Sequence, residues 1–324
     1  VAAASGCPLY LSKDAGLSWT ASFVPLNWRA VASSSDGSNL VAAVYGGRIY
    51  TSADSGTSWT QRSILTNWQS VASSADGVKL VAAVEEGQLY TSTDSGATWT
   101  EREINRRWKS VASSADGTKL AAVVQYGYLY TSIDSGTTWV ARTTSRNWVS
   151  VASSADGTKL AAAVDTGYIY TSSDSGVTWM EGVNARSWQA VAMSADGTRL
   201  IAPTAFGPIF TSADSGATWT AHENNRWWVT AASSADGTKL VAGVNGGQIY
   251  TSAGSVVGPQ GTTVALQYLG NDAWQPLSES LVGAGTVGSA QLLINAVQSS
   301  NIAAGAVGEA QLAAGAVDNT KLAN

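Results

Sequence analysis

The chain has 324 residues, a formal net charge of −5 and charged side chains at only 13% of its positions. This acidic balance argues against a nucleic-acid partner, because binding to phosphates requires a clustered basic surface. With a single cysteine and a single histidine the chain cannot form an internal disulfide, and neither a metal site nor a cofactor is expected. No apolar run reaches the ~18 residues that a membrane-spanning helix needs, and no signal peptide is visible.

Tryptophan is the residue that reveals the organisation of the chain, with fourteen copies against three phenylalanines. Twelve of the tryptophans recur at a step of forty residues, in one series from Trp19 to Trp219 and another from Trp28 to Trp228. The unusual composition is therefore the consequence of an internal repeat, and the repeat decides the fold.

One repeat unit, residues 68–107, holds four short runs separated by Gly and Asp turns. The predicted strands are Trp68–Ser73, Leu80–Val84, Gln88–Ser92 and Thr98 to about Arg102. Four strands in a unit of about 40 residues predict a blade of a β-propeller, and thus an all-β fold class. The second strand is apolar on both faces, which is typical of a sheet that is covered by neighbours on both sides.

The turn between the third and fourth strands carries the motif Ser52-x-Asp54-x-Gly56-x-x-Trp59, which is present six times. Its acidic residues are Asp14, Asp54, Asp94, Asp134, Asp174 and Asp214. The motif resembles the Asp-box of the BNR repeat family, found in sialidases, sortilin-like receptors and photosystem assembly factors. The resemblance covers residues 1 to about 252, and it implies that these aspartates are structural. A seventh copy, at 252–255, is broken.

Counting strands predicts a propeller domain over residues 1–278. Five blades are complete, a sixth begins at Trp228, and residues 1–20 supply strands two to four of a further blade. We expect Thr263–Leu269 to complete the sixth blade and Trp274–Ser278 to be the first strand of a seventh. The ring would then close by joining both ends of the chain, with six blades as the alternative.

The segment 279–324 has a different pattern, in which Val and Leu or Ile recur with a period of ten and Gly marks most turns. One large apolar residue in five is too few to form a core within a monomer. Such repeats resemble the stalks of phage and bacterial tail fibres, which implies a homotrimer formed through residues 283–324. A disordered Ala/Gly linker is the alternative.

Two sets of loops differ from blade to blade, whereas the Asp-box and Ala-Asp-Gly loops barely change. The variable loops join strand four to the next strand one and strand two to strand three, and in an up-and-down blade both lie on one face. Variation confined to one face predicts recognition there, with drift of solvent-exposed loops as the alternative. The candidate ligand-binding residues are Arg106, Arg107, Arg146, Arg186, Arg226, Trp227, Tyr45, Tyr126, Phe206, Glu86 and Asp165. The arginines suit sugars or carboxylates, although packing of their stems on a neighbouring Trp explains them equally well.

These features predict a non-enzymatic recognition head that binds a glycan or surface polymer and is extracellular or associated with a fibre. A protein-binding assembly scaffold is the main alternative, and a sialidase-like glycosidase is a weaker one. The arginines occupy equivalent positions in successive repeats, and the tyrosines recur periodically as core residues. Glu85-Glu86 is the one pair of neighbouring carboxylates. Glycoside hydrolysis normally needs two carboxyl groups across one bond, so no catalytic residue is expected. His222 is expected to be solvated on a loop.

Overall fold

The computed structural model describes residues 1–14, 18–182, 185–252, 265–268 and 274–277. The chain divides into two units, 1–278 and 279–324, and every described residue belongs to the first. Strands and turns make up this described part, which confirms the all-β class. It contains no helix long and apolar enough to cross a membrane. The predicted stalk or linker lies outside the described residues.

Five groups of four antiparallel strands follow one another along the chain, and we call them blades one to five. Blade one holds β4 (Leu26–Ser33), β5 (Leu40–Val44), β6 (Gly47–Ser52) and β7 (Thr60–Thr66). Blade two holds β8 (Trp68–Ser73), β9 (Leu80–Val84), β10 (Gly87–Ser92) and β11 (Thr100–Arg106). Blade three holds β12 (Trp108–Ser113), β13 (Leu120–Gly127), β14 (Leu129–Ser132) and β15 (Val140–Ala141). Blade four holds β16 (Arg146–Ser153), β17 (Leu160–Val164), β18 (Ile169–Ser172) and β19 (Met180–Glu181). Blade five holds β20 (Ala192–Met193), β21 (Leu200–Pro203), β22 (Gly207–Ser212) and β23 (Thr220–Arg226).

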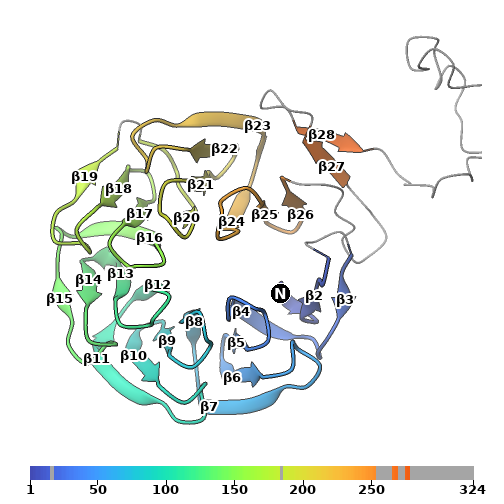
Figure 1. Ribbon diagram of the computed structural model, residues 1–324, viewed down its shortest axis with the longest axis vertical. Coiled ribbons are helices and arrows are strands. Elements are labelled where there is room, and N and C mark those ends of the chain that lie inside the picture. The colour runs from blue at the N-terminus through green and yellow to red at the C-terminus, as the bar shows by residue number, and fades with distance from the viewer. Residues whose placement is uncertain (15–17, 183–184, 253–264, 269–273, 278–324) are drawn as a thin grey trace, which may run out of the picture. The chain divides into compact units, whose positions relative to one another are not determined.

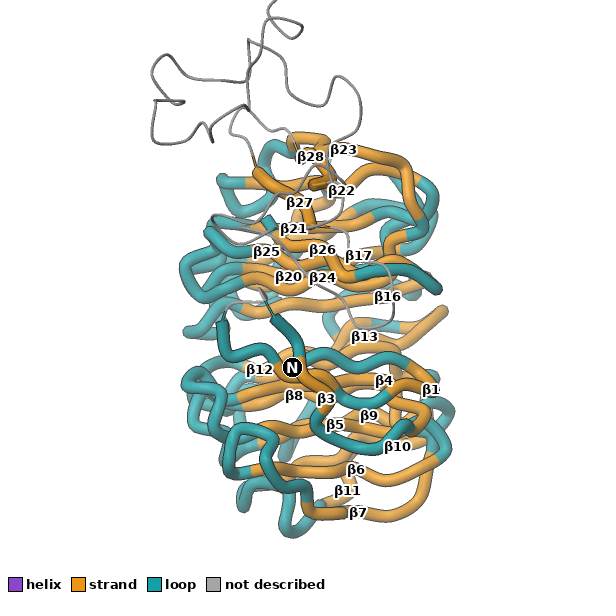
Figure 2. Tube along the Cα trace, turned by 90° about the vertical axis from the view of Figure 1, so that its right-hand side faces the viewer, coloured by secondary structure: helices purple, strands orange, loops and turns teal. Residues whose placement is uncertain are grey.

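Shorter sheets lie at the two ends of this series. Blade six holds β24 (Trp228–Ser233), β25 (Leu240–Val244) and β26 (Ile249–Thr251). The N-terminal segment holds β1 (Ser5–Cys7), β2 (Tyr10–Leu11) and β3 (Thr20–Ala21), and the C-terminal part of the unit holds β27 (Ala265–Tyr268) and β28 (Trp274–Leu277). β1 also pairs with β4, and β13 of blade three pairs with β16 of blade four. Blades one to six are arranged around a common axis with their first strands innermost (Figure 1). The strands run across the thickness of the unit, so the loops gather at two faces (Figure 2).

The hydrophobic core lies between successive blades. Leu80 and Ala82 of β9 pack against blade one, in a cluster that includes Ile49. Val81 and Ala83 of the same strand pack against blade three. Alternate residues of a strand point to opposite faces, so a strand covered on both sides must be apolar at every position. The prediction made from the apolar second strand is therefore confirmed.

Each Asp-box is held by hydrogen bonds within its own turn. In the box of blade two Asp94 accepts the amide of Thr98 at 2.8 Å and its hydroxyl at 2.6 Å, and these donors lower the pKa of Asp94 to about 2. Trp99 donates from Nε1 to the carbonyl of Gly96 at 3.0 Å. Gly96 has a φ of +82°, and a Cβ there would lie 2.9 Å from Cγ2 of Thr51 in the preceding blade. The aspartates are structural in all boxes that the structure describes.

The broken box in blade six has a visible consequence. Ser252 occupies the position of the box serine, but the sequence has Gly254 in place of the aspartate. In the box of blade two the equivalent Ser92 donates to Asp94 and accepts the amide of Gly96. Ser252 instead accepts the amide of Leu240 at 2.7 Å. The hydroxyl of Ser252 thus bonds to the neighbouring strand of its own sheet.

Residues 1–21 repeat the pairing of strands two to four. Ala2 pairs with Tyr10, and Tyr10 pairs with Ala21, as Ala42 and Gln61 pair with Tyr50 in blade one. At the other end β28 pairs with β27 as a hairpin. The described residues show no pairing between β28 and the N-terminal strands. Closure of the ring by 274–278 and the total number of blades therefore stay predictions.

Candidate functional site: the variable-loop face

The two sets of variable loops lie on the same face of the blades, as predicted. The amide of Tyr45, in the turn between β5 and β6, donates to the carbonyl of Asn27 at 2.9 Å. Asp165 and Asn147 form the same bond in blade four at 3.0 Å. Because this bond joins the two kinds of loop, they form one surface, which we call the variable face. The Asp-boxes and Ala-Asp-Gly turns lie at the other ends of the strands.

The same two loops also meet across each junction between blades. At two junctions the side chain of the second residue of the two-to-three turn contacts that of the residue that precedes the tryptophan of the next blade. At the junction of blades two and three this contact is an ion pair, with Arg107 Nε 3.3 Å from Glu86 Oε1. At the junction of blades five and six it is an aromatic pair, with the rings of Phe206 and Trp227 5.1 Å apart between centroids and tilted by 32°. Both residues of the pair therefore change together from one junction to the other.

The second turn residue has a left-handed backbone, which glycine adopts without strain. Gly46 and Gly246 occupy this position in blades one and six, with φ of 68° and 63°. The other four blades have Glu86, Tyr126, Thr166 and Phe206 there, with φ between 54° and 57°. Side chains of this size are disfavoured in that conformation by roughly 1–2 kcal/mol. The turn geometry does not explain these residues, so we attribute them to what they present to solvent.

The aromatic pair is an exposed apolar feature of this face. Phe206 is 70% exposed and Trp227 is 45% exposed, and each lies on a loop anchored to the rigid blade behind it. Tyr126, 64% exposed, occupies the Phe206 position two junctions away. Flat, exposed rings on a rigid support offer contact area at a small cost in conformational entropy.

Blades one to three carry a polar cluster on the inner strands beside this face. Arg29 donates to Gln69 Oε1 at 3.0 Å across the first junction. Burial lowers the pKa of Lys109, and the positive charges of Arg29 and Arg107 lower it further. The charge of Glu85 raises the pKa of Tyr45 on the adjacent turn. This cluster is charged and hydrogen-bonded. The position that Arg29 and Lys109 occupy in their repeats is Val149 in blade four and Val229 in blade six.

Asp165 is held by neighbours rather than free in solution. It accepts the hydroxyl of Ser187 at 2.6 Å and the amide group of Asn147 at 3.4 Å. Ser187 precedes the tryptophan of blade five, so this contact too crosses a junction. The structure therefore distributes the predicted site residues over successive junctions, and it does not bring them together into one pocket.

The four repeat-equivalent arginines have a shared structural role. Each guanidinium lies over the aromatic ring on the third strand of the blade whose tryptophan follows it in the sequence, 4.3–4.9 Å from the centroid. The pairs are Arg106 with Tyr130, Arg146 with Tyr170, Arg186 with Phe210 and Arg226 with Tyr250. These arginines thus pack on an aromatic ring, as the alternative interpretation expected, but the ring belongs to Tyr or Phe and not to Trp. One face of each guanidinium is used in this contact.

The tyrosines of the third strands are core residues, as predicted. Tyr90, Tyr130 and Tyr170 are all at most 7% exposed and meet the tryptophan of their own blade edge-on. Tyr90 donates to Glu101 at 3.2 Å, and Tyr170 donates to Glu181. Burial, together with this bond, raises the pKa of Tyr170 to about 12. The bond recurs in blades two and four, where the tyrosine ring is buried and the glutamate is exposed, and the repeat position of the tyrosine has a sufficient structural explanation.

The expectation for His222 is wrong. This residue lies on β23 and is 9% exposed, with Nε2 2.5 Å from Oγ1 of Thr211. Arg62, Arg102 and Arg142 occupy the same position in blades one to three and contact the equivalent threonines. The sequence predicts a loop over residues 221–227, whereas in the structure β23 extends from Thr220 to Arg226.

Sequence analysis also missed Arg29 and Lys109. Both directly follow a blade tryptophan, where the six repeats have Arg, Gln, Lys, Val, Gln and Val. Comparison of the repeats at this position, in addition to the loops, is the signal that identifies them. Among the described residues no group of three or more His, Cys, Asp and Glu side chains is placed to hold a metal ion.

No protein-family model and no curated protein matches the sequence. Solved structures, however, share the fold. The chain is similar to the GH74 enzyme of Niastella koreensis, with a TM-score of 0.64 and 17% identity over 85% of this chain and 56% of that one. It is similar to the GH74 xyloglucanase from Xanthomonas campestris, with a TM-score of 0.62 and 16% identity over 77% of this chain and 49% of that one. It is also similar to YCF48 from Cyanidioschyzon merolae, with a TM-score of 0.55 and 17% identity over 69% of this chain and 81% of that one.

These likenesses show that the fold is that of the Asp-box β-propeller proteins. At such low identity they show the fold alone, since one fold hosts many unrelated functions. The chain spans only about half the length of the two GH74 enzymes.

Proposed function

We propose that this chain is a non-enzymatic recognition module that binds a glycan or similar surface polymer through its variable face. The observation that carries the proposal is the pair Phe206 and Trp227, two exposed rings in contact across one blade junction. The C–H face of a sugar ring packs on aromatic faces, whose negative potential attracts it. The neighbouring Asn, Ser and Arg side chains supply hydrogen bonds to hydroxyl groups.

The distribution of the site residues supports weak binding at several junctions rather than tight binding at one. Each junction offers a different pair on the same backbone, so a polymer that crosses the face meets several contacts in succession. Linked weak contacts raise overall affinity through effective concentration. Display of three heads through residues 283–324, on a fibre or cell surface, would multiply this effect and is part of the proposal.

Catalysis is not part of the proposal. Glu86 is paired with Arg107, and Asp165 is bonded to Ser187. Neither carboxylate faces a second one across a space for a scissile bond, which is the arrangement that glycoside hydrolysis normally uses.

A protein-binding scaffold is the second candidate, and one comparison favours it. The chain is also similar to a structure described as YCF48 bound to D1 peptide, with a TM-score of 0.54 and 14% identity over 77% of this chain. A propeller of this fold thus binds a peptide in at least one protein. For this chain, the charged cluster around Arg29 and Lys109 would be the corresponding contact surface.

A glycan array distinguishes the two candidates, with a variant that converts one junction into another. Replacing Phe206→Gly together with Trp227→Asn reproduces the Gly46–Asn67 composition of the first junction, so the turn stays compatible with its backbone. We expect the array signals of the native chain to fall at least tenfold in this variant. Val177→Thr is the control, since residue 177 is exposed in an Asp-box turn and Thr occupies its position in other boxes.

Array signals that survive the double substitution would contradict the proposed site. Absence of any glycan signal, combined with capture of a single protein partner that Lys109→Ala weakens, would support the scaffold instead.

A further inference from the structure

The turn between β25 and β26 contains Asn245-Gly246, the one Asn-Gly pair of the chain. Aspartate precedes glycine at six further positions, all in the Ala-Asp-Gly turns and their Ser-Asp-Gly equivalent in blade one. Both kinds of pair share one side reaction, in which the amide nitrogen of the glycine attacks Cγ of the residue before it. Glycine favours this reaction because it has no Cβ to obstruct the approach and its backbone rotates freely.

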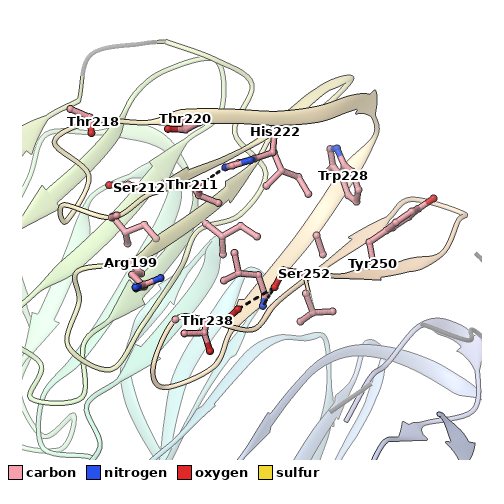
Figure 3. A pocket seen from close by; sticks show the side chains of 18 of the residues that line it. Arg199, Thr211, Ser212, Thr218, Thr220, His222, Trp228, Thr238, Tyr250 and Ser252 are labelled. Atoms are coloured by element: carbon pink, nitrogen blue, oxygen red, sulfur yellow. Dashed lines mark hydrogen bonds between the residues drawn. The ribbon is translucent and has the colours of Figure 1, made fainter. Parts of the chain in front are cut away.

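Blade six carries one pair of each kind, at the two ends of β25. At the Asp236-Gly237 end the amide of Gly237 donates to the carbonyl of Ser234 at 2.9 Å. Thr238, labelled in Figure 3, donates its amide and its hydroxyl to the carboxylate of Asp236 at 3.0 and 2.7 Å. The hydroxyl of Ser234 donates to the same carboxylate, and these donors hold the pKa of Asp236 well below its ordinary value. Both reacting groups are therefore bonded elsewhere, and an ionised carboxylate is a poor electrophile.

The other five Asp-Gly pairs have the same arrangement. Each glycine amide donates to a serine carbonyl at 2.9–3.1 Å. Each carboxylate accepts the hydroxyl of that serine and the amide two residues further along the chain. Gly117 also packs on the preceding blade, where an added Cβ would lie 2.7 Å from Cβ of Lys79. Reaction at these pairs therefore requires the turn to open first.

The Asn245-Gly246 pair lacks this protection. Within the described structure neither the amide of Gly246 nor the side chain of Asn245 makes a hydrogen bond. The backbone of Gly246 is left-handed, with a φ of 63°, and that of Gly237 is left-handed as well, with a φ of 68°. The two ends of β25 thus differ in their hydrogen bonds and not in the handedness of the glycine.

The accessibility of this turn is a property of the repeat. Tyr45 and Gly46 occupy the same positions in blade one, where the following blade is described, and both are exposed. The amide of Gly46 also donates no hydrogen bond to any described residue. In blade four the side chain of Asp165 is held by the amide group of Asn147. The residue equivalent to Asn147 in blade six is Trp227, which has no amide group to donate.

We propose that Asn245 is a site of spontaneous deamidation in the folded protein, whereas the six Asp-Gly pairs are protected from the analogous isomerisation. The nitrogen of Gly246 loses its proton and bonds to Cγ of Asn245, and the bond from Cγ to Nδ2 breaks, so that ammonia leaves. Water then opens the resulting succinimide at either carbonyl carbon, which gives aspartate or isoaspartate at position 245. Water is the one co-reactant that the sequence of steps needs.

The two products differ in what they do to the variable face. Aspartate adds a negative charge at a turn position that is Glu85 in blade two and Asp165 in blade four. Isoaspartate lengthens the main chain by one carbon directly after the amide of Asn245, which donates to the carbonyl of Trp227 at 2.8 Å. The modification therefore changes the surface beside Trp227, and the inference does not depend on which ligand that surface binds.

The test compares the folded and unfolded chain. The full chain is incubated for several days in native buffer and in urea, at a mildly alkaline pH that favours loss of the glycine proton. Mass spectrometry after digestion with chymotrypsin then follows the two pairs of blade six in separate peptides, because the enzyme cleaves after Leu240 and Tyr250. We expect Asn245 to react less than tenfold more slowly in the folded chain than in urea. Isomerisation of Asp236 is expected to be at least tenfold slower in the folded chain.

Two variants separate the chemistry of asparagine from the effect of the turn. Glu85→Asn with Glu86→Gly copies the pair into blade two, whose neighbours on both sides are described, and it is expected to deamidate in the folded chain. Asp116→Asn is the matched control, because it places asparagine before glycine in a turn whose glycine amide remains bonded. We expect this control to stay intact in the folded chain and to react in urea.

The proposal is overturned if folding slows the reaction of Asn245 by tenfold or more, or if it slows that of Asp236 by less. It is also overturned if the pair copied into blade two stays intact, or if Asp116→Asn deamidates in the folded chain as fast as Asn245.

Discussion

The amide of Ala75 donates a hydrogen bond of 2.7 Å to the carbonyl of Ala115, which occupies the same position one blade further along. The bond is repeated from Ser35 to Ala75 and onward to Ala235. A continuous ladder therefore connects the six Ala-Asp-Gly turns near the inner strands. Such a ladder has two unsatisfied ends unless a further blade joins them.

Deleting residues 262–278 is expected to lower the melting temperature by more than about 5 °C, because it removes the segment predicted to close the ring. Differential scanning calorimetry of the full chain and the deletion measures the effect. Deletion of 283–324 is the control and is expected to leave the temperature unchanged. An unchanged melting point in the first deletion, or a density map with six blades, would contradict closure by seven.

The Asp-boxes predict loss of stability in acid. A carboxyl whose pKa is lower in the folded state than in the unfolded state stabilises the fold above its unfolded pKa, about 3.9 for Asp. That contribution is lost as the pH falls through the folded value, which is about 2 for Asp94. The urea midpoint should therefore decrease between about pH 4 and pH 2. Thr98→Val removes the hydroxyl that contributes most to the shift and should weaken this dependence, whereas Thr98→Ser should preserve it.

Two glycines with similar backbones should respond differently to alanine. Gly46→Ala is expected to cost about 1 kcal/mol of unfolding free energy, because only the left-handed backbone is strained. Gly96→Ala is expected to cost about 3 kcal/mol or more, because its Cβ would also lie 2.9 Å from Thr51 of the preceding blade. Urea unfolding measures both. Equal losses would show that the contact between blades relaxes without cost.

The arginine over Phe210 is expected to serve both stability and binding. Arg186→Lys should lower the unfolding free energy by about 0.5–1 kcal/mol, since lysine lacks the planar group that stacks on the ring. We also expect the glycan-array signals to fade, because the outer face of the guanidinium remains available to a ligand. Arg199→Lys is the matched control, since four other repeats carry lysine at that position. Unchanged array signals would leave Arg186 with a structural role alone.

Trimerisation is tested by light scattering on the full chain and on residues 1–280. The full chain should have three times the mass of the monomer and the truncated chain should be monomeric, because Val and Leu at a period of ten can be buried only when chains share them. A monomeric full chain would favour the linker interpretation of 279–324.

The sequence by itself determined the blade. Local hydrogen bonds and alternation along a strand determine the positions of strands and turns. They also determine the burial of Leu80–Val84 on both faces and the structural role of Asp94. The sequence contains this pattern six times. Gly96 is also determined locally, because the backbone of its own Asp-box requires a glycine there.

Only the tertiary structure decided what happens between blades. The ion pair of Glu86 with Arg107 and the ring contact of Phe206 with Trp227 join residues about twenty positions apart, and the stacking of Arg186 on Phe210 is of the same kind. His222 is buried on β23 and contacts Thr211 of the adjacent strand, which its position beside Glu223 in the sequence does not indicate. Periodicity predicts which face of a strand is covered, but the partner of each side chain depends on the twist and spacing of adjacent sheets, which no single repeat encodes.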